Sequence, residues 1–262
     1  MKQGILIVSF GTTYQETREK NIEKIANTVR KQFSDWNVYQ AYSSNTVRSI
    51  LKKRDQLEIP DTKEALVQMS KEGITHVVVL PTHIIDGIEN NRMKQSILDC
   101  SALFTNITTA RVLLDCDEDY KLTAKALWEE IKAFADEAPV IWMGHGSAHE
   151  ADKSYEKLEL ELRNYSGHEN YMATVEGEVT IESVLGRLMD SPQPKGRVLL
   201  LPFMLVAGDH ATNDMAGEED SFASLLQHEG YEPECMLKGI GEYDSIRDIY
   251  IQHLREAMAE LK

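Results

Sequence analysis

The sequence predicts an α/β fold made of two similar domains, each a parallel sheet flanked by helices. Three observations indicate this fold. Short apolar runs alternate with helix-length segments, the strongest runs are continuously apolar, and the whole pattern occurs twice along the chain. Strands buried on both faces of a parallel sheet have this continuous apolar character, and strands that alternate with helices are typical of parallel α/β sheets.

The expected strands are short segments rich in apolar and β-branched residues. They cover residues 5–8, 37–42, 76–80, 110–114, 140–143, 171–175, 197–201 and 234–237. Helices are expected over residues 15–33, 62–72 and 122–134, because apolar side chains recur there every three or four positions and form one face.

The two halves of the chain resemble each other. The first half reads "ILIVSFGTT" and later "VVVLPTH", and the second reads "VIWMGHGSA" and later "VLLLPFM". Each half opens with a strand that ends in a glycine-containing turn, and each later carries an apolar run ending in Leu-Pro. We therefore expect domains at residues 1–125 and 126–262 with a cleft between them, and the last helix can pack back on the first domain.

Composition excludes several classes of protein. The 262 residues carry a net charge of −15, which disfavours binding to nucleic acid or to anionic membranes. No run of about 18 apolar residues occurs, and the N-terminal segment lacks the features of a secretory signal. Three scattered cysteines, with no CxxC spacing, do not suggest a disulfide framework. These features predict a cytoplasmic enzyme.

Polar side chains follow the ends of several expected strands. Parallel sheets bind ligands outside the carboxyl ends of their strands, and His83, His145, Glu176 and His210 all lie at such positions. Imidazole is a common ligand of divalent metals and a base near neutral pH. Each of these residues also has a purely structural interpretation, and Glu178 competes with Glu176 as the functional acid.

His145 stands between two glycines, which allow a sharp turn and the close approach of another molecule. Its alternative role is to cap the following helix. His149 lies four residues later and is either a second metal ligand on the same helical face or a solvated residue. Ser147 is not supported as a nucleophile, since no neighbouring motif supplies a triad. The phosphate-binding and nucleophile-elbow motifs GxxxxGK[ST], GxGxxG after a strand and GxSxG are absent.

Five segments together resemble one known family. They are "VSFGTTYQET", "THIIDG", "MGHGSAH", "VEGEV" and "LPFMLVAGDHATNDMAGEED". They resemble the class II chelatases of the anaerobic cobalamin pathway, the sirohydrochlorin cobaltochelatase family, and the likeness covers essentially the whole chain. The resemblance implies two α/β domains around a tetrapyrrole cleft. It also implies ATP-independent insertion of Co²⁺ into sirohydrochlorin (or precorrin-2), with no organic cofactor.

The resemblance further implies a set of functional residues. His145, Glu176 and His210 correspond to the metal ligands, and His145 and Glu176 to the catalytic groups. Such ligands suit Co²⁺ and also accept Fe²⁺, Ni²⁺ or Zn²⁺. On the opposite side of the cleft, five residues are expected to contact the substrate: Ser9, Phe10, Thr12, Tyr14 and His83.

Other functions remain open at this point. The chain could be a chelatase of different specificity (Fe²⁺ for sirohaem, Ni²⁺, or protoporphyrin), or a non-catalytic tetrapyrrole- or metal-binding protein. Periplasmic solute-binding proteins also have two α/β lobes, although the absent signal argues against that class. The carboxylates of sirohydrochlorin require local cations, for which Arg54, Arg92 and Lys94 are candidates. Long apolar helix faces fit either a core or a homo-oligomer interface.

Overall fold

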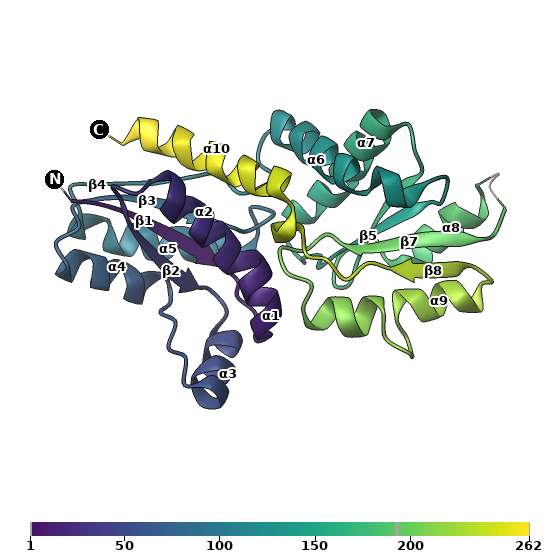
Figure 1. The fold of residues 1–262 in the computed structure, drawn as a ribbon, viewed down its shortest axis with the longest axis horizontal. Coiled ribbons are helices and arrows are strands. Elements are labelled where there is room, and N and C mark those ends of the chain that lie inside the picture. The colour runs from purple at the N-terminus through teal and green to yellow at the C-terminus, as the bar shows by residue number, and fades with distance from the viewer. Residues whose placement is uncertain (1, 192–193, 262) are drawn as a thin grey trace. The chain divides into compact units, whose positions relative to one another are not determined.

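The computed structural model describes residues 2–191 and 194–261 (Figure 1). Contacts within the chain divide it into two compact units. The first unit is Met1–Asp115 with Arg247–Lys262, and the second unit is Cys116–Ile246. The expected boundary between residues 125 and 126 lies inside one continuous helix, α6 (Asp117–Ala135), and the division between the units precedes this helix. Most of the last helix, α10 (Asp244–Glu260), belongs to the first unit.

The first unit contains a four-stranded parallel sheet in the order β2-β1-β3-β4. The central residues of β1, from Ile5 to Val8, are fully buried, as expected for a strand covered on both faces. Helices α4 (Thr62–Lys71) and α5 (Ile88–Cys100) cover one face of this sheet, and α2 (Lys24–Gln32) and α10 cover the other (Figure 1). The strands are β1 (Gln3–Ser9), β2 (Asn37–Tyr42), β3 (His76–Pro81) and β4 (Asn106–Thr109).

The helix expected over residues 15–33 is present but not uniform, because a π-helical turn (Glu19–Glu23) separates α1 from α2. Helix α4 begins with a capping box, in which Asp61 and Glu64 each accept a hydrogen bond from the other's backbone N–H. The α-helices of this unit that precede α10 are α1 (Gln15–Arg18), α2 (Lys24–Gln32), α3 (Asn45–Asp55), α4 (Thr62–Lys71) and α5 (Ile88–Cys100).

The strand expected over residues 110–114 is wrong. The strand of this region is β4, four residues earlier, and its half-buried sequence Asn-Ile-Thr-Thr gives little apolar signal because β4 is an edge strand. Residues 112–114 are buried, but they lie outside the named strands: the N–H groups of Leu113 and Leu114 donate to His83 and Ile84, and an isolated bridge joins Leu114 to Ile85. Their apolar character reflects burial and not strand pairing.

The second unit repeats the architecture, with a four-stranded parallel sheet in the order β6-β5-β7-β8. The strands are β5 (Val140–Gly144), β6 (Asn170–Thr174), β7 (Arg197–Pro202) and β8 (Glu232–Cys235). After α6 it contains the α-helices α7 (Lys153–Ser166), α8 (Ile181–Met189) and α9 (Phe222–His228), and a π-helical turn (Ala211–Met215) precedes α9. The prediction of two similar parallel α/β sheets flanked by helices is confirmed.

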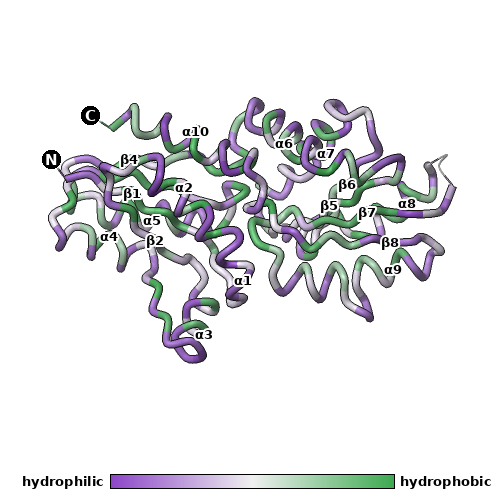
Figure 2. Tube along the Cα trace, viewed as in Figure 1, coloured by the Kyte–Doolittle hydropathy of each residue, from purple (hydrophilic) through white to green (hydrophobic). Residues whose placement is uncertain are grey.

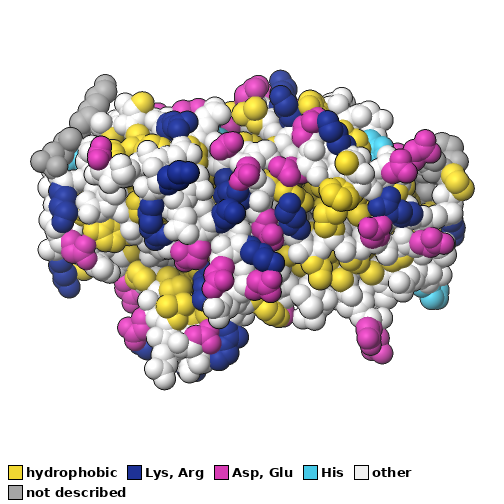
Figure 3. Space-filling model, viewed as in Figure 1, with side chains coloured by type: hydrophobic (Ala, Val, Ile, Leu, Met, Phe, Trp, Pro, Cys, Tyr) yellow, Lys and Arg dark blue, Asp and Glu magenta, His cyan; other side chains and the backbone are white. Residues whose placement is uncertain are grey.

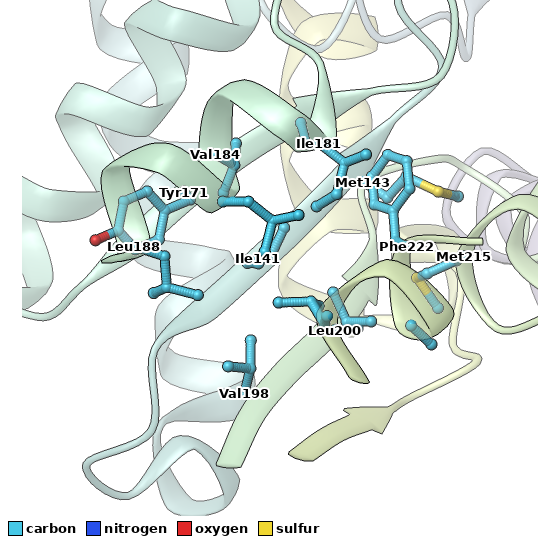
Figure 4. Close-up of a cluster of buried hydrophobic side chains, with 14 of the residues drawn as sticks. Ile141, Met143, Tyr171, Ile181, Val184, Leu188, Val198, Leu200, Met215 and Phe222 are labelled. Carbon is cyan, nitrogen blue, oxygen red and sulfur yellow. The ribbon is translucent and has the colours of Figure 1, made fainter. Parts of the chain in front are cut away.

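A hydrophobic cluster holds the second sheet against its covering helices (Figure 4). The cluster includes alternate residues of β5, Ile141 and Met143, together with side chains of α8 such as Val184 and Leu188. Met215, from the π-helical turn, and residues of α9 complete the cluster. Figure 2 shows the same pattern along the chain, with hydrophobic strands inside and hydrophilic residues on the outer sides of the helices.

The backbone hydrogen bonds beyond the strand ends also repeat between the units. In the first unit, Ser44 N–H donates to Phe10 C=O at 3.2 Å. In the second unit, Glu176 N–H donates to His145 C=O at 2.8 Å. The turn after β5 therefore has the same backbone pattern as the turn after β1, and His145 occupies the position equivalent to Phe10.

On the face shown in Figure 3, basic and acidic side chains are interspersed, so no extended surface of one sign forms there. Within residues 2–191 and 194–261, no helix combines the length and apolar character that crossing a membrane requires.

Candidate metal site

Three of the expected functional residues lie at one edge of the second sheet. His145 follows β5 directly, Glu176 lies two residues after β6, and His210 lies between β7 and the π-helical turn. Neighbouring parallel strands end at the same edge of a sheet, so these loops are brought together although they are far apart in sequence.

The two imidazoles contact each other. The ring centroids of His145 and His210 are 4.7 Å apart, with the ring planes at 85°. The Glu176 Oε2 atom lies 3.9 Å from His145 Nδ1, which is too long for a hydrogen bond but close enough for a small rotation to bring the groups together. The side chains of His145, Glu176 and His210 are 42%, 63% and 35% exposed, so a ligand can reach all three.

Steric contacts explain why glycine stands on either side of His145, and the contacts differ between the two positions. A Cβ on Gly144 would lie 2.8 Å from Cδ1 of Tyr155, whose ring packs against this position. Gly146 has φ +84°, and a Cβ there would lie 2.8 Å from the Cα of Gly177 and 2.9 Å from the carbonyl carbon of Glu176. The GHG sequence therefore lets the His145 loop lie directly against the loop that carries Glu176.

A buried carboxylate joins these two loops. Asp152 is 5% exposed; its Oδ1 accepts a hydrogen bond from the backbone N–H of Ser147 at 2.9 Å. Its Oδ2 accepts one from the backbone N–H of Glu178 at 2.8 Å. Gly177 fits over this carboxylate, since a Cβ there would lie 2.5 Å from Asp152 Oδ1. Sequence reasoning did not single out Asp152, whose partners are known only from the tertiary structure.

His149 caps a helix and is not part of the pair formed by the His145 and His210 imidazoles. Its Nδ1 accepts a hydrogen bond from the backbone N–H of Ala151 at 3.1 Å and so caps the short 3₁₀ helix Glu150–Asp152. The Ser147 hydroxyl accepts a hydrogen bond from the backbone N–H of His149 at 3.1 Å. The capping role that the sequence left open for His145 is thus performed by His149.

The imidazole pair and the Glu176 carboxylate lie close together, but they do not form a complete metal-coordination shell. Across the described ranges, no three His, Cys, Asp or Glu side chains are grouped so that they could hold a metal ion. His145 and His210 touch, and Glu176 lies beside the Nδ1 edge of His145. The exposed carboxylate must rotate to join a common ion. The backbone of Glu178 is near, but no contact of its side chain with either imidazole is found.

The five expected substrate-side residues all lie in the first unit, near the carboxyl ends of β1 and β3. Phe10 and Tyr14 are 48% and 42% exposed, whereas Ser9 and Thr12 are buried. The Ser9 hydroxyl accepts a hydrogen bond from Thr82 at 2.8 Å, and the Thr12 hydroxyl accepts one from the backbone N–H of Tyr14 at 3.3 Å. The exposed aromatic rings are therefore presented by a loop whose polar groups hold its conformation.

His83 is buried, and its ring nitrogens are unequally satisfied. Nδ1 lies 3.4 Å from Asn90 Oδ1, whereas Nε2 is buried with no hydrogen-bond partner. The Asn90 amide donates to Asp86 at 2.7 Å, which leaves its oxygen to accept from His83. Burial lowers the pKa of His83, so the imidazole is neutral near pH 7 and Nε2 is an unused acceptor.

The cations suggested by the sequence are already paired. Arg92 pairs with Glu89 at 2.5 Å, Lys94 with Asp86 at 2.7 Å, and Arg54 with Asp55 at 2.8 Å. A different cation, Arg18, has a buried Nη1 atom with no hydrogen-bond partner. The buried hydroxyl groups of Tyr42 and Ser43, at the end of the neighbouring strand β2, are also unpartnered.

The protein thus consists of two parallel α/β units, with a pair of imidazoles and a carboxylate exposed at one edge of the second sheet. A family model described as cobalt chelatase (CbiK) matches residues 3–259. The chain belongs to this family. The family predicted from the sequence motifs is confirmed.

Two curated relatives align along nearly their whole lengths. A sirohydrochlorin cobaltochelatase of Salmonella typhimurium is 32% identical, over 98% of this chain and 97% of the relative. The sirohydrochlorin cobaltochelatase CbiKC of Nitratidesulfovibrio vulgaris is 34% identical, over 99% of this chain and 92% of the relative.

Two solved structures share the fold at low sequence identity. SirB from Bacillus subtilis, solved with Fe³⁺, has a TM-score of 0.72 and 15% identity, covering 99% of this chain and 97% of SirB. CbiX, described as the terminal enzyme of sirohaem biosynthesis in denitrifying bacteria, has a TM-score of 0.57 and 12% identity, covering 97% of this chain and 99% of CbiX. At these identities the comparison concerns the fold alone.

Proposed function

We propose that this protein inserts Co²⁺ into sirohydrochlorin, without ATP hydrolysis, as a step of anaerobic cobalamin biosynthesis. The relatives that carry this activity in their names align with nearly the whole chain. The structural observation that supports it is the pair of exposed imidazoles, His145 and His210, with centroids 4.7 Å apart and a carboxylate beside them.

Metallation exchanges two pyrrole N–H protons for one dication, so the site must present the metal and accept protons. In this proposal, His145 and His210 bind Co²⁺ and leave positions open for the macrocycle nitrogens, which displace water. Imidazole and carboxylate ligands suit Co²⁺. His145 also takes a pyrrole proton once the metal has left it, because the freed imidazole nitrogen can act as a general base.

We assign the acid of the site to Glu176 in preference to Glu178. Glu176 is directly joined to the His145 loop by the hydrogen bond from its N–H to the His145 carbonyl, and its carboxylate lies 3.9 Å from the imidazole. The side chain is 63% exposed and free to rotate. It completes the metal shell or accepts the second pyrrole proton.

The first unit offers groups that suit the macrocycle. Phe10 and Tyr14 present exposed aromatic surface to the apolar faces of the ring. The unpartnered Arg18 Nη1, with the hydroxyl groups of Tyr42 and Ser43, suits a substrate carboxylate, because buried polar atoms without partners mark positions that water or a ligand satisfies. His83 Nε2, two residues beyond the end of β3, is a further acceptor in the same unit.

An absorbance assay tests the proposal. Purified protein and sirohydrochlorin are mixed with Co²⁺, and the rate of the spectral change is compared with the spontaneous rate. We expect acceleration by the wild type and near-complete loss of it in His145→Ala, while the matched control His149→Ala, which removes only a helix cap, keeps most of the activity.

A wild-type rate equal to the spontaneous rate would show a binding protein, and a fully active His145→Ala would contradict the assigned site. Repeating the assay with Fe²⁺, Ni²⁺ and Zn²⁺ ranks the metals, since the residue types alone do not select among them. A ranking with Fe²⁺ or Ni²⁺ well above Co²⁺ would replace the cobalt assignment with a chelatase of that specificity.

A further inference from the structure

The His210 imidazole is held by a carboxylate of its own turn. Asp214 Oδ2 lies 2.7 Å from His210 Nδ1, a hydrogen-bonding distance. The side chains of Ala211 and Met215 anchor this turn, because both are fully buried in the core of the second unit. The pair therefore stands on a rigid π-helical turn, a feature that is frequent at functional sites.

This contact assigns roles to the two ring nitrogens of His210. A carboxylate only accepts hydrogen bonds, so Nδ1 must carry the proton. In the neutral imidazole Nε2 then has a free lone pair and is the nitrogen available to a metal. A carboxylate behind a metal-binding imidazole fixes the ring orientation and increases its basicity as a ligand.

The His145 imidazole has a different partner. Its Nδ1 lies 3.1 Å from the carbonyl oxygen of Gly146, and Glu176 is 3.9 Å away. A backbone carbonyl also fixes the tautomer, but it is neutral. The two imidazoles of the site are therefore not equivalent: the partner of His210 is an anion and the hydrogen-bonded partner of His145 is not.

We propose that Asp214 is a positioning residue that directs His210 Nε2 toward the dication and makes His210 the stronger metal donor of the two imidazoles. Asp214 acts through His210 and does not contact the metal. This inference concerns the site of the proposed function, but it predicts metal affinity and can be tested with no tetrapyrrole present.

The test compares four variants with the wild type at one fixed pH, and His210→Ala among them gives the effect of losing the imidazole itself. Asp214→Ala removes the partner of Nδ1, and Asp214→Asn keeps an oxygen acceptor without the charge. Asn213→Ala is the matched control, since Asn213 lies on the same turn but its amide donates to Asp209 at 3.1 Å. The dissociation constant for Co²⁺ alone is measured by calorimetry and by the visible absorption of the bound ion.

We expect Asp214→Ala to weaken Co²⁺ binding about 10- to 100-fold, the usual effect of removing a group that supports a metal ligand. Asp214→Asn should lose less, and Asn213→Ala should bind as the wild type does. In the insertion assay, Asp214→Ala should lower the rate at subsaturating Co²⁺ while the KM for sirohydrochlorin stays unchanged.

Two results would overturn the inference. If Asp214→Ala binds Co²⁺ with wild-type affinity, the carboxylate only stabilises the turn, whatever its effect on thermal unfolding. If Asp214→Asn loses as much affinity as His210→Ala and the absorption of bound Co²⁺ changes to that of a different coordination number, Asp214 is itself a ligand. A wild type that binds Co²⁺ but does not accelerate insertion would instead refute the proposed function alone.

Discussion

Replacing Gly146 by alanine tests whether the close approach of the two loops creates the site. Gly146 has φ +84°, where an L side chain is strained by roughly 1–2 kcal/mol. The added Cβ would also lie 2.8 Å from Gly177 Cα and 2.9 Å from the Glu176 carbonyl carbon. These are backbone atoms, so the clash can be relieved only if the His145 and Glu176 loops separate.

Separation of the loops has two measurable consequences. It weakens the 2.8 Å hydrogen bond from Glu176 N–H to the His145 carbonyl, which contributes about 0.5–1.5 kcal/mol. Together with the backbone strain, we expect Gly146→Ala to lose roughly 1.5–3.5 kcal/mol of unfolding free energy. Moving a catalytic imidazole by about 1 Å can lower a rate on the order of 10²-fold, so metallation should fall by about that factor.

Gly167 provides the matched control. It also has positive φ, +65°, but apart from its chain neighbours no residue comes within 4 Å of the position its Cβ would take. Gly167→Ala should therefore lose only the roughly 1–2 kcal/mol of backbone strain and keep its metallation rate. Urea unfolding and the absorbance assay measure both quantities. If Gly146→Ala behaves like Gly167→Ala in both, the loop contact does not determine the geometry of the site.

Three further predictions concern the same region and the buried histidine. Asp152→Ala leaves two backbone N–H groups without their acceptor, and we expect a loss of about 1–3 kcal/mol with reduced metallation; wild-type values in urea unfolding and activity would argue against a role in joining the loops. Glu176→Gln should reduce metallation strongly while Glu178→Gln does not, and the reverse ranking would move the assignment to Glu178. Because burial lowers the pKa of His83 below its unfolded value, the stability it contributes is present above about pH 6.5 and is lost as the pH falls through the lower folded pKa. In His83→Asn, the urea concentration at the unfolding midpoint should fall less as the pH is lowered below about 6.5. An unchanged pH profile would show that other groups cause the fall.

Much of the fold follows from local patterns in the sequence. Continuously apolar segments such as Val140–Met143 form strands because both faces of the sheet are covered, and the pattern for this is local. The same reasoning failed at residues 110–114, where buried apolar residues continue beyond the true edge strand β4. Apolar character reports burial, but strand pairing depends on hydrogen bonds with residues distant in sequence.

The residue types of the candidate site were also readable, since His145, Glu176 and His210 each follow a strand end and the family motifs mark them. What the sequence could not give is their arrangement. The 4.7 Å contact between the imidazoles depends on the order β6-β5-β7, which places three loops at one edge of the sheet. From the sequence, helix capping was the alternative role of His145, and solvent exposure was that of His149. Only the hydrogen bond from Ala151 N–H shows that His149 is the cap.

The sequence by itself determined the class of fold, its duplication and the kind of chemistry, because periodicity and side-chain type are properties of single segments. The tertiary structure alone decided which groups support that chemistry. Asp152 joins two loops that are separate in sequence, and Asp214 reaches His210 because their turn is anchored in the core. Such contacts depend on how distant segments pack, and a linear pattern does not encode that packing in any local signal.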